Sequence, residues 1–170
     1  FVELTSMADL PARTGLGSSG SYLVGLLTAV RAYQRKSIAP AKIAEEACHI
    51  EMDILKEPVG KQDQYMAAFG GFRSLDISKS GQVTVTSVPV DFMSVTELIQ
   101  KTRVYYTGIQ RSATAVLKAQ NDASKQKESP DHGRVVDCLA HIKDIGRRIE
   151  KAFRDKDLDG FARLMDDHWR

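Results

Sequence analysis

Apolar residues in the last third of the chain recur every three or four positions, which is the spacing of one helix face. The first series is Leu139, Ile142, Ile145, Ile149 and Phe153, and the second is Leu158, Phe161, Leu164 and Met165. We therefore predict a long helix followed by a shorter one, with the polar residues Lys156 and Asp157 between them. Both apolar faces are expected to pack in the core.

Helices are also predicted in the earlier part of the chain. Residues 21–35 read as one helix, and a second begins at Pro40, because proline is favoured in the first helical turn. The second helix is expected to run to about Leu55. Residues 62–68 are expected to form a short helical turn, and the chain is predicted to become helical again from Ala113.

Three segments alternate apolar and polar residues with a period of two, which predicts strands. Residues 72–77 and 82–88 are separated by a short polar segment that contains Gly81, a hairpin signal. Residues 2–8 and 102–107 are predicted as further strands. The order of one strand, two helices, three strands and three helices predicts an α+β fold, with helices packed on an antiparallel sheet.

Composition narrows the class of protein. The chain has 170 residues, of which 42% are hydrophobic and 27% charged, an ordinary globular composition. The net charge of +2 gives no reason to expect a nucleic-acid or membrane partner. No run approaches the roughly 20 apolar residues of a membrane-spanning helix.

The cysteines and histidines give no sign of a disulfide framework or of zinc. Cys48 and Cys138 form no CxxC motif, so we predict two small core residues in a reduced, cytoplasmic protein. The four histidines show no metal-ligand spacing with these cysteines.

Residues 11–20, Pro-Ala-Arg-Thr-Gly-Leu-Gly-Ser-Ser-Gly, carry the strongest chemical signal. Gly15, Gly17 and Gly20 permit positive φ and close backbone approach at the start of a predicted helix. A helix start of this kind gathers free N–H groups and the positive end of the helix dipole, which suits a phosphate. The alternative is a glycine- and serine-rich helix start that binds no ligand.

Two better-known phosphate loops fit poorly. A P-loop needs Lys and then Ser or Thr after its last glycine, whereas Ser21 and Tyr22 follow Gly20. The spacing of the glycines matches a dinucleotide fingerprint, which also needs a strand and an acid about 20 residues on. After Gly20, no acid occurs before Glu45, and a helix is predicted instead of the strand. A nucleotide-dependent oxidoreductase is therefore the weakest of the functions considered.

Residues 11–20 resemble the ATP-phosphate loop of the GHMP kinases, although that family usually has Ala at the position of Gly20. Residues 58–72 and 105–120 resemble the segments that follow in the same family, in the same order, and are most similar to the sugar-kinase branch that includes the heptose 7-phosphate kinases. The resemblance implies a ribosomal protein S5 domain 2-like part followed by the start of a ferredoxin-like domain. It implies a partial N-terminal domain at 1–122 and a partial C-terminal domain at 123–170.

The resemblance also assigns residues to ATP and to the substrate. The ATP-binding residues would be Pro11, Gly15, Leu16, Gly17, Ser18, Ser19 and Gly20. Asp63 would face the hydroxyl to be phosphorylated, as base or as orienter, with Gly60 beside the substrate. Lys61 would keep Asp63 ionised or contact a phosphate, and Arg111 would bind a phosphate of the substrate. The alternative for Asp63, Lys61 and Arg111 is an ordinary exposed position.

By the same resemblance, Glu51 and Ser19 would bind Mg²⁺, with Ser18 a less favoured choice than Ser19. Mg²⁺ favours one or two protein oxygens together with phosphates and water. Several carboxylates near Glu51 leave open that it belongs to a solvated acidic helix face.

We therefore expect an ATP- and Mg²⁺-dependent kinase that transfers the γ-phosphoryl group to a sugar or sugar phosphate. The resemblance favours the anomeric hydroxyl of heptose 7-phosphate. The alternative is a non-catalytic nucleotide- or sugar-binding member of the family. The family's first and last motifs do not occur in residues 1–170, so we expect a piece of a longer kinase. The pattern predicts no oligomeric state.

Overall fold

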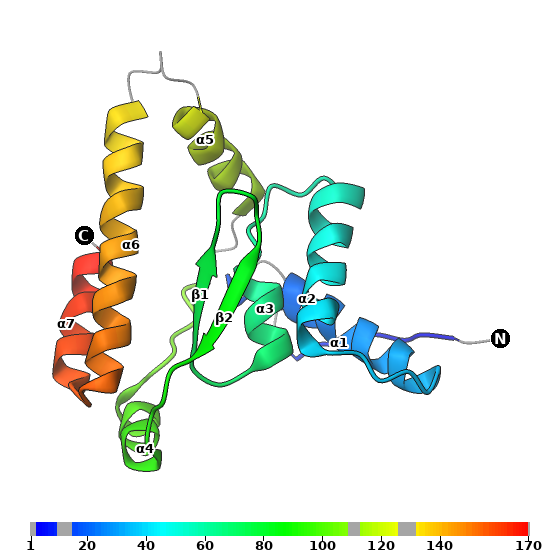
Figure 1. The fold of residues 1–170 in the computed structure, drawn as a ribbon, viewed down its shortest axis with the longest axis horizontal. Helices are drawn as coiled ribbons and strands as arrows, with labels where there is room; N and C mark the ends of the chain where they lie inside the picture. Colours follow the sequence, from blue (N-terminus) through cyan, green and yellow to red (C-terminus); the bar gives the residue numbers. More distant parts are fainter. Residues whose placement is uncertain (1–2, 10–14, 109–112, 126–131, 170) are drawn as a thin grey trace. The chain divides into compact units, whose positions relative to one another are not determined.

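The computed structural model describes residues 3–9, 15–108, 113–125 and 132–169 (Figure 1). The chain forms two compact units. The first comprises residues 1–68 and 105–117, and the second comprises residues 69–104 and 118–170. The boundary predicted between residues 122 and 123 stays a prediction. Helices and one antiparallel strand pair together confirm the α+β class.

Helices α1 (Ser18–Tyr33), α2 (Pro40–Cys48) and α3 (Gln62–Phe69) build the first unit (Figure 1). Its core brings together Val24 of α1 with Ile43 and Ala47 of α2, all buried. The partly buried residues packed on this cluster are Leu23, Leu27, Ile38 and Ala68. These three helices confirm the pattern predicted for this region, and α1 begins three residues earlier than expected.

The second helix ends in a wider turn, η1 (His49–Ile54), which is π-helical. The N–H of Leu55 donates to the carbonyl of Ile50 at 2.9 Å, five residues back. A π-helical turn changes which residues face inward, and such turns are frequent at functional sites. Here it carries Glu51, which is 3% exposed.

The second unit contains the predicted hairpin. Strands β1 (Arg73–Ile77) and β2 (Val83–Ser87) pair antiparallel, with Leu75 opposite Val85. Gly81 has φ +81° in the connecting turn, a conformation that glycine adopts without steric cost.

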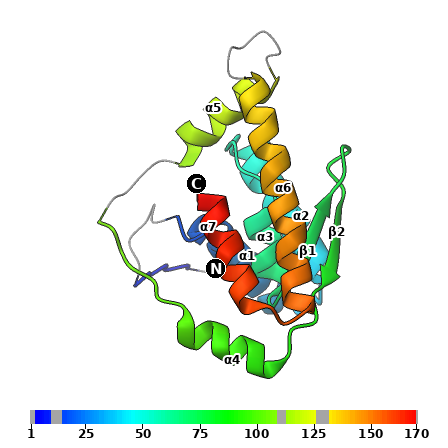
Figure 2. The same ribbon diagram turned by 90° about the vertical axis from the view of Figure 1, so that its left-hand side faces the viewer.

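Helices α4 (Phe92–Lys101), α5 (Ala113–Lys125), α6 (His132–Arg154) and α7 (Leu158–Trp169) complete the structure. Helices α6 and α7 lie side by side in both views (Figures 1 and 2). Ile145, Ala152 and Leu164 are buried between them. The ring of Phe153 contacts Phe72 at 4.9 Å and Phe161 at 4.8 Å between centroids.

The predicted burial of the two apolar faces is only partly right. Ile145, Phe153 and Leu164 are buried, whereas Leu139 and Ile142 are 39% and 42% exposed. The 12 residues of α7 lie along only the C-terminal part of the 23-residue α6, so α7 does not cover the N-terminal half of α6 (Figure 2). Met165 and Cys138 are also exposed, against prediction.

The strands predicted at 2–8 and 102–107 are wrong over the residues described, 3–8 and 102–107, which pair with no strand there. Alternation favours an extended backbone, but a strand also needs a neighbour to accept its hydrogen bonds. Helix α4 was not predicted. Its N-cap is Asp91, whose carboxylate accepts hydrogen bonds from the backbone N–H groups of Met93 and Ser94, both at 3.1 Å.

Across the described helices, none combines the length and the apolar character needed to cross a membrane.

Candidate active site

The start of α1 forms a cradle of backbone N–H groups. Gly17 precedes the helix in the left-handed conformation, with φ +64°, and Gly15 also has positive φ at +76°. The first N–H groups of a helix have no acceptor within the helix, and no described side chain caps this end. With the positive end of the helix dipole, these groups favour an anion at Ser18 and Ser19.

Leu16 and Gly20, which are also predicted for ATP, lie at the same end of α1. Leu16 is 55% exposed, and Gly20 is buried in the first turn of α1. Pro11 lies outside the described residues. The ATP-binding role of the loop stays a prediction, but its geometry suits a phosphate.

Asp63 lies against this loop. It stands in the first turn of α3, and a Cβ atom on Gly17 would lie 3.1 Å from its Oδ2 atom. A Cβ atom on Gly20 would lie 3.1 Å from the Cβ of Asp63 and 3.3 Å from the backbone nitrogen of Gln64. The two glycines therefore let α3 approach the loop closely, and they bring the predicted catalytic carboxylate to the predicted phosphate site.

Glu51 reaches the same place from the π-helical turn. The hydroxyl of Ser19 donates a hydrogen bond to its Oε1 atom, and the side-chain amide of Gln64 donates one to its Oε2 atom. The two residues predicted to bind Mg²⁺ are thus in direct contact. The pairing with Ser19 and Gln64 argues against the alternative of a solvated acidic face.

The donor set at this point fits Mg²⁺. A hydroxyl oxygen and a carboxylate oxygen are hard ligands, and Mg²⁺ commonly takes one or two such groups from a protein. No cluster of three or more His, Cys, Asp or Glu side chains forms a metal site in the described part of the chain. An ion bound here would therefore rely on few protein oxygens.

Lys61 forms an ion pair with Glu45, 3.2 Å from its Oε2 atom. The hydroxyl of Tyr65 donates a hydrogen bond to the same carboxylate. The Tyr65 hydrogen bond, and then the Lys61 ammonium group, hold the pKa of Glu45 below its usual range. The role predicted for Lys61 at Asp63 stays a prediction.

Gly60 and Arg111 are the other residues predicted for the substrate, beside Asp63. Gly60 is exposed just before α3, and its missing side chain would meet no atom within 4 Å. Arg111 lies outside the described residues. Both assignments stay predictions.

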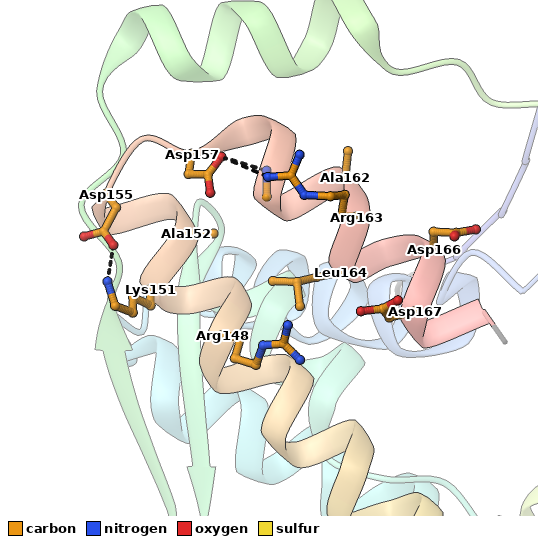
Figure 3. A pocket seen from close by; sticks show the side chains of 11 residues that line it. Arg148, Lys151, Ala152, Asp155, Asp157, Ala162, Arg163, Leu164, Asp166 and Asp167 are labelled. Carbon is orange, nitrogen blue, oxygen red and sulfur yellow. Dashed lines mark hydrogen bonds and ion pairs between the residues drawn. The ribbon is translucent and has the colours of Figure 1, made fainter.

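A hollow of about 850 Å³ lies elsewhere, between α6 and α7 in the second unit (Figure 3). Four of its charged side chains form the ion pairs Lys151–Asp155 and Arg163–Asp157. None of the predicted site residues lines it. The candidate active site is therefore the convergence of α1, η1 and α3 in the first unit.

The residues of the candidate active site lie in a segment that is similar to a known protein family. Residues 1–71 match the family profile of the GHMP kinases N terminal domain. That segment holds the glycine loop, Glu51 and Asp63. Residues 1–71 are therefore similar to a GHMP kinase N-terminal domain. The resemblance carried by the glycine loop and by the segment around Asp63 is confirmed.

Two relatives extend this likeness to nearly the whole chain. A D-glycero-alpha-D-manno-heptose 7-phosphate kinase from Campylobacter jejuni is 26% identical over 168 residues, covering 99% of this chain and 48% of that protein. A crystal structure described provisionally as a sugar kinase from Campylobacter jejuni superposes with a TM-score of 0.70 at 26% identity, over 95% of this chain and 43% of that one. The chain spans about half the length of these relatives.

One residue of the candidate site, Gln64, was not predicted from the sequence. Gln64 follows Asp63 directly and bonds to Glu51, yet glutamine is not a residue type that carries phosphoryl-transfer chemistry by itself. Its only sequence signal is its place beside Asp63 in the segment 60–65. The contact joins residues 13 positions apart, which a local pattern cannot reveal.

Proposed function

We propose that this chain forms the phosphate-binding and hydroxyl-binding part of an ATP- and Mg²⁺-dependent sugar kinase. The observation that carries the proposal is the close approach of Asp63 to Gly17 and Gly20. It sets a carboxylate beside an anion-binding helix start, and phosphoryl transfer needs a group near the attacking hydroxyl at such a place.

Each group of residues in the candidate site has a separate proposed role in phosphoryl transfer. The N–H groups at the start of α1 would bind the phosphates of ATP. Ser19 and Glu51 would hold Mg²⁺, which supplies charge neutralisation at the phosphate oxygens. Asp63 would orient the sugar hydroxyl and accept its proton. The hydroxyl oxygen bonds to the γ-phosphorus, the bond from that phosphorus to the β–γ bridging oxygen breaks, and ADP leaves.

The proposed acceptor is the anomeric hydroxyl of heptose 7-phosphate. The name of the Campylobacter jejuni relative supports this choice, because its 26% identity extends over 99% of the chain. Arg111 is proposed for the phosphate that the sugar already carries, since arginine binds phosphate through two parallel hydrogen bonds. Because ATP is the donor, we place the reaction in the cytoplasm.

The test is ADP release by the purified protein with Mg²⁺-ATP and a series of sugars. We expect ADP release with heptose 7-phosphate and much less with the same heptose without its phosphate. Phosphorus NMR of the product should show a new phosphate ester on the anomeric carbon. ATP binding without ADP release for any sugar would contradict the proposal and favour the non-catalytic alternative.

A further inference from the structure

Gln64 is among the most deeply buried polar residues described. Its side chain is 2% exposed, and its Nε2 atom donates a hydrogen bond to Oε2 of Glu51. A carboxylate oxygen only accepts hydrogen bonds, so the nitrogen of the amide must face Glu51. The orientation of the Gln64 amide is thereby fixed.

The other end of the same amide is not satisfied. The Oε1 atom of Gln64 is buried and has no hydrogen-bond partner among the described residues. A buried acceptor without a donor lowers stability, and such groups in native proteins call for an explanation, of which a role in catalysis is one. Stability alone therefore gives little reason for a glutamine at this position.

We infer that Gln64 is a positioning residue that holds the Glu51 carboxylate toward Ser19 and thereby sets the affinity of the site for Mg²⁺. Glu51 is 3% exposed, so solvent cannot replace the donor that Gln64 supplies. With Oε2 held by Gln64, Oε1 is left facing the hydroxyl of Ser19. The inference rests on the proposed function, in which Ser19 and Glu51 hold the ion.

The position of Gln64 in the chain also couples the two halves of the site. Gln64 follows Asp63 in the first turn of α3, and its backbone nitrogen lies beside Gly20. One helical turn thus carries the carboxylate proposed to face the sugar hydroxyl and the amide that orients the proposed metal ligand. A residue that orients a metal ligand typically changes metal affinity or activity about 10- to 100-fold when it is replaced.

The experiment compares Gln64→Met with the unchanged protein by calorimetry of ATP binding over a Mg²⁺ titration. Methionine has a similar length but donates no hydrogen bond. We expect unchanged ATP affinity in EDTA and a half-saturating Mg²⁺ concentration raised roughly 10- to 100-fold. Gln100→Met, on the exposed side of α4, is the matched control and should leave the titration unchanged.

A double variant shows whether Gln64 acts through Glu51. In a Glu51→Gln background, Gln64→Met should add no further shift, because the oriented carboxylate is already gone. A Mg²⁺ titration of Gln64→Met that coincides with the unchanged protein would overturn the inference, and so would a double variant whose shift is the product of the two single shifts.

A second variant and a kinetic measurement distinguish a specific effect on Mg²⁺ binding from misfolding of Gln64→Met. Gln64→Asn keeps the amide but is one carbon shorter, so it should give the same shift if Gln64→Met does not fold. ADP release at saturating Mg²⁺ should return to within a few-fold of the unchanged protein, whereas a loss that Mg²⁺ does not restore would overturn the inference. A protein that binds Mg²⁺-ATP but phosphorylates no sugar would contradict the proposed function, while the calorimetry still decides the role of Gln64.

Discussion

The carboxylate of Asp63 lies directly against Gly17. A Cβ atom on Gly17 would be only 3.1 Å from the Oδ2 atom of Asp63. Gly15 shares the positive φ of Gly17 but has no atom within 4 Å of its Cβ position. Gly17 is therefore constrained twice, by its backbone conformation and by Asp63. This contact links the phosphate loop to the proposed catalytic carboxylate.

Gly17→Ala should lower the turnover number roughly 100-fold, because a displacement of about 1 Å at a reacting group costs that much. The new methyl group pushes Asp63 away and also strains the backbone. Gly15→Ala carries similar backbone strain without the contact, so its loss should be smaller. Gly25→Ala, within α1 and in open space, is the control and should not change turnover. Equal losses for Gly15→Ala and Gly17→Ala would show that contact with Asp63 is unimportant.

Glu51→Gln should raise the Mg²⁺ concentration needed for half-maximal ADP release by at least about tenfold, because a neutral amide is a poorer ligand for a hard cation than a carboxylate. Asp53→Asn is the matched control, since Asp53 lies in the same turn with an exposed side chain bonded to His49. If the Mg²⁺ titrations of Glu51→Gln and of the unchanged protein coincide, the proposal that Glu51 binds Mg²⁺ is contradicted.

Tyr65→Phe should lower the free energy of unfolding by about 1 kcal/mol at pH 7, since the hydrogen bond is to a charged group but Glu45 is half exposed. The pKa of Glu45 is lowered in the folded state, so its stabilisation is present above its ordinary pKa of 4.5 and is lost as the pH falls through the lower folded value. The difference between the two proteins should therefore shrink below about pH 4.5. Urea unfolding from pH 3 to pH 7 measures it, with the exposed Tyr22→Phe as control. A difference that stays constant across this range would contradict the account.

Thiol labelling should distinguish the two cysteines. Burial, and then the neighbouring charge of Glu45, raise the pKa of Cys48 to about 11, and its side chain is 2% exposed. Cys138 is exposed on α6. An aromatic disulfide reagent at pH 8 should therefore modify one thiol in the native protein and two in denaturant, and Cys138→Ser should abolish the native reaction. Rapid labelling of two thiols without denaturant would contradict the buried placement of Cys48.

The sequence pattern predicted those helices whose signal lies within their own residues. Proline at the start of α2 and the helical spacing in α6 gave the right element type. The strand predicted at 102–107 was wrong because a local pattern can favour an extended backbone but cannot supply the neighbouring strand that accepts its hydrogen bonds. Helix α4 was missed although Asp91 is a recognisable N-cap, because its first residues, Phe92 and Met93, are exposed and give no core-facing period.

The candidate site was predictable in its residue types but not in its contacts. Glycines at a helix start indicate a phosphate, and the resemblance supplied Asp63 and Glu51. The partners of these residues are set by tertiary packing between α1, η1 and α3. That packing joins Gln64 to Glu51, and it pairs Lys61 with Glu45, neither of which the sequence predicted.

Asp63→Asn tests the central claim most directly. The substitution keeps the size of the side chain but removes its capacity to accept the proton, so ADP release should fall about 100- to 10,000-fold. ATP affinity measured by calorimetry should change little, because the loop of α1 is intact. Asp76→Asn, exposed on β1, is the control for loss of a carboxylate. A near-native rate of ADP release for Asp63→Asn would contradict the assignment of Asp63 as the group that receives the proton.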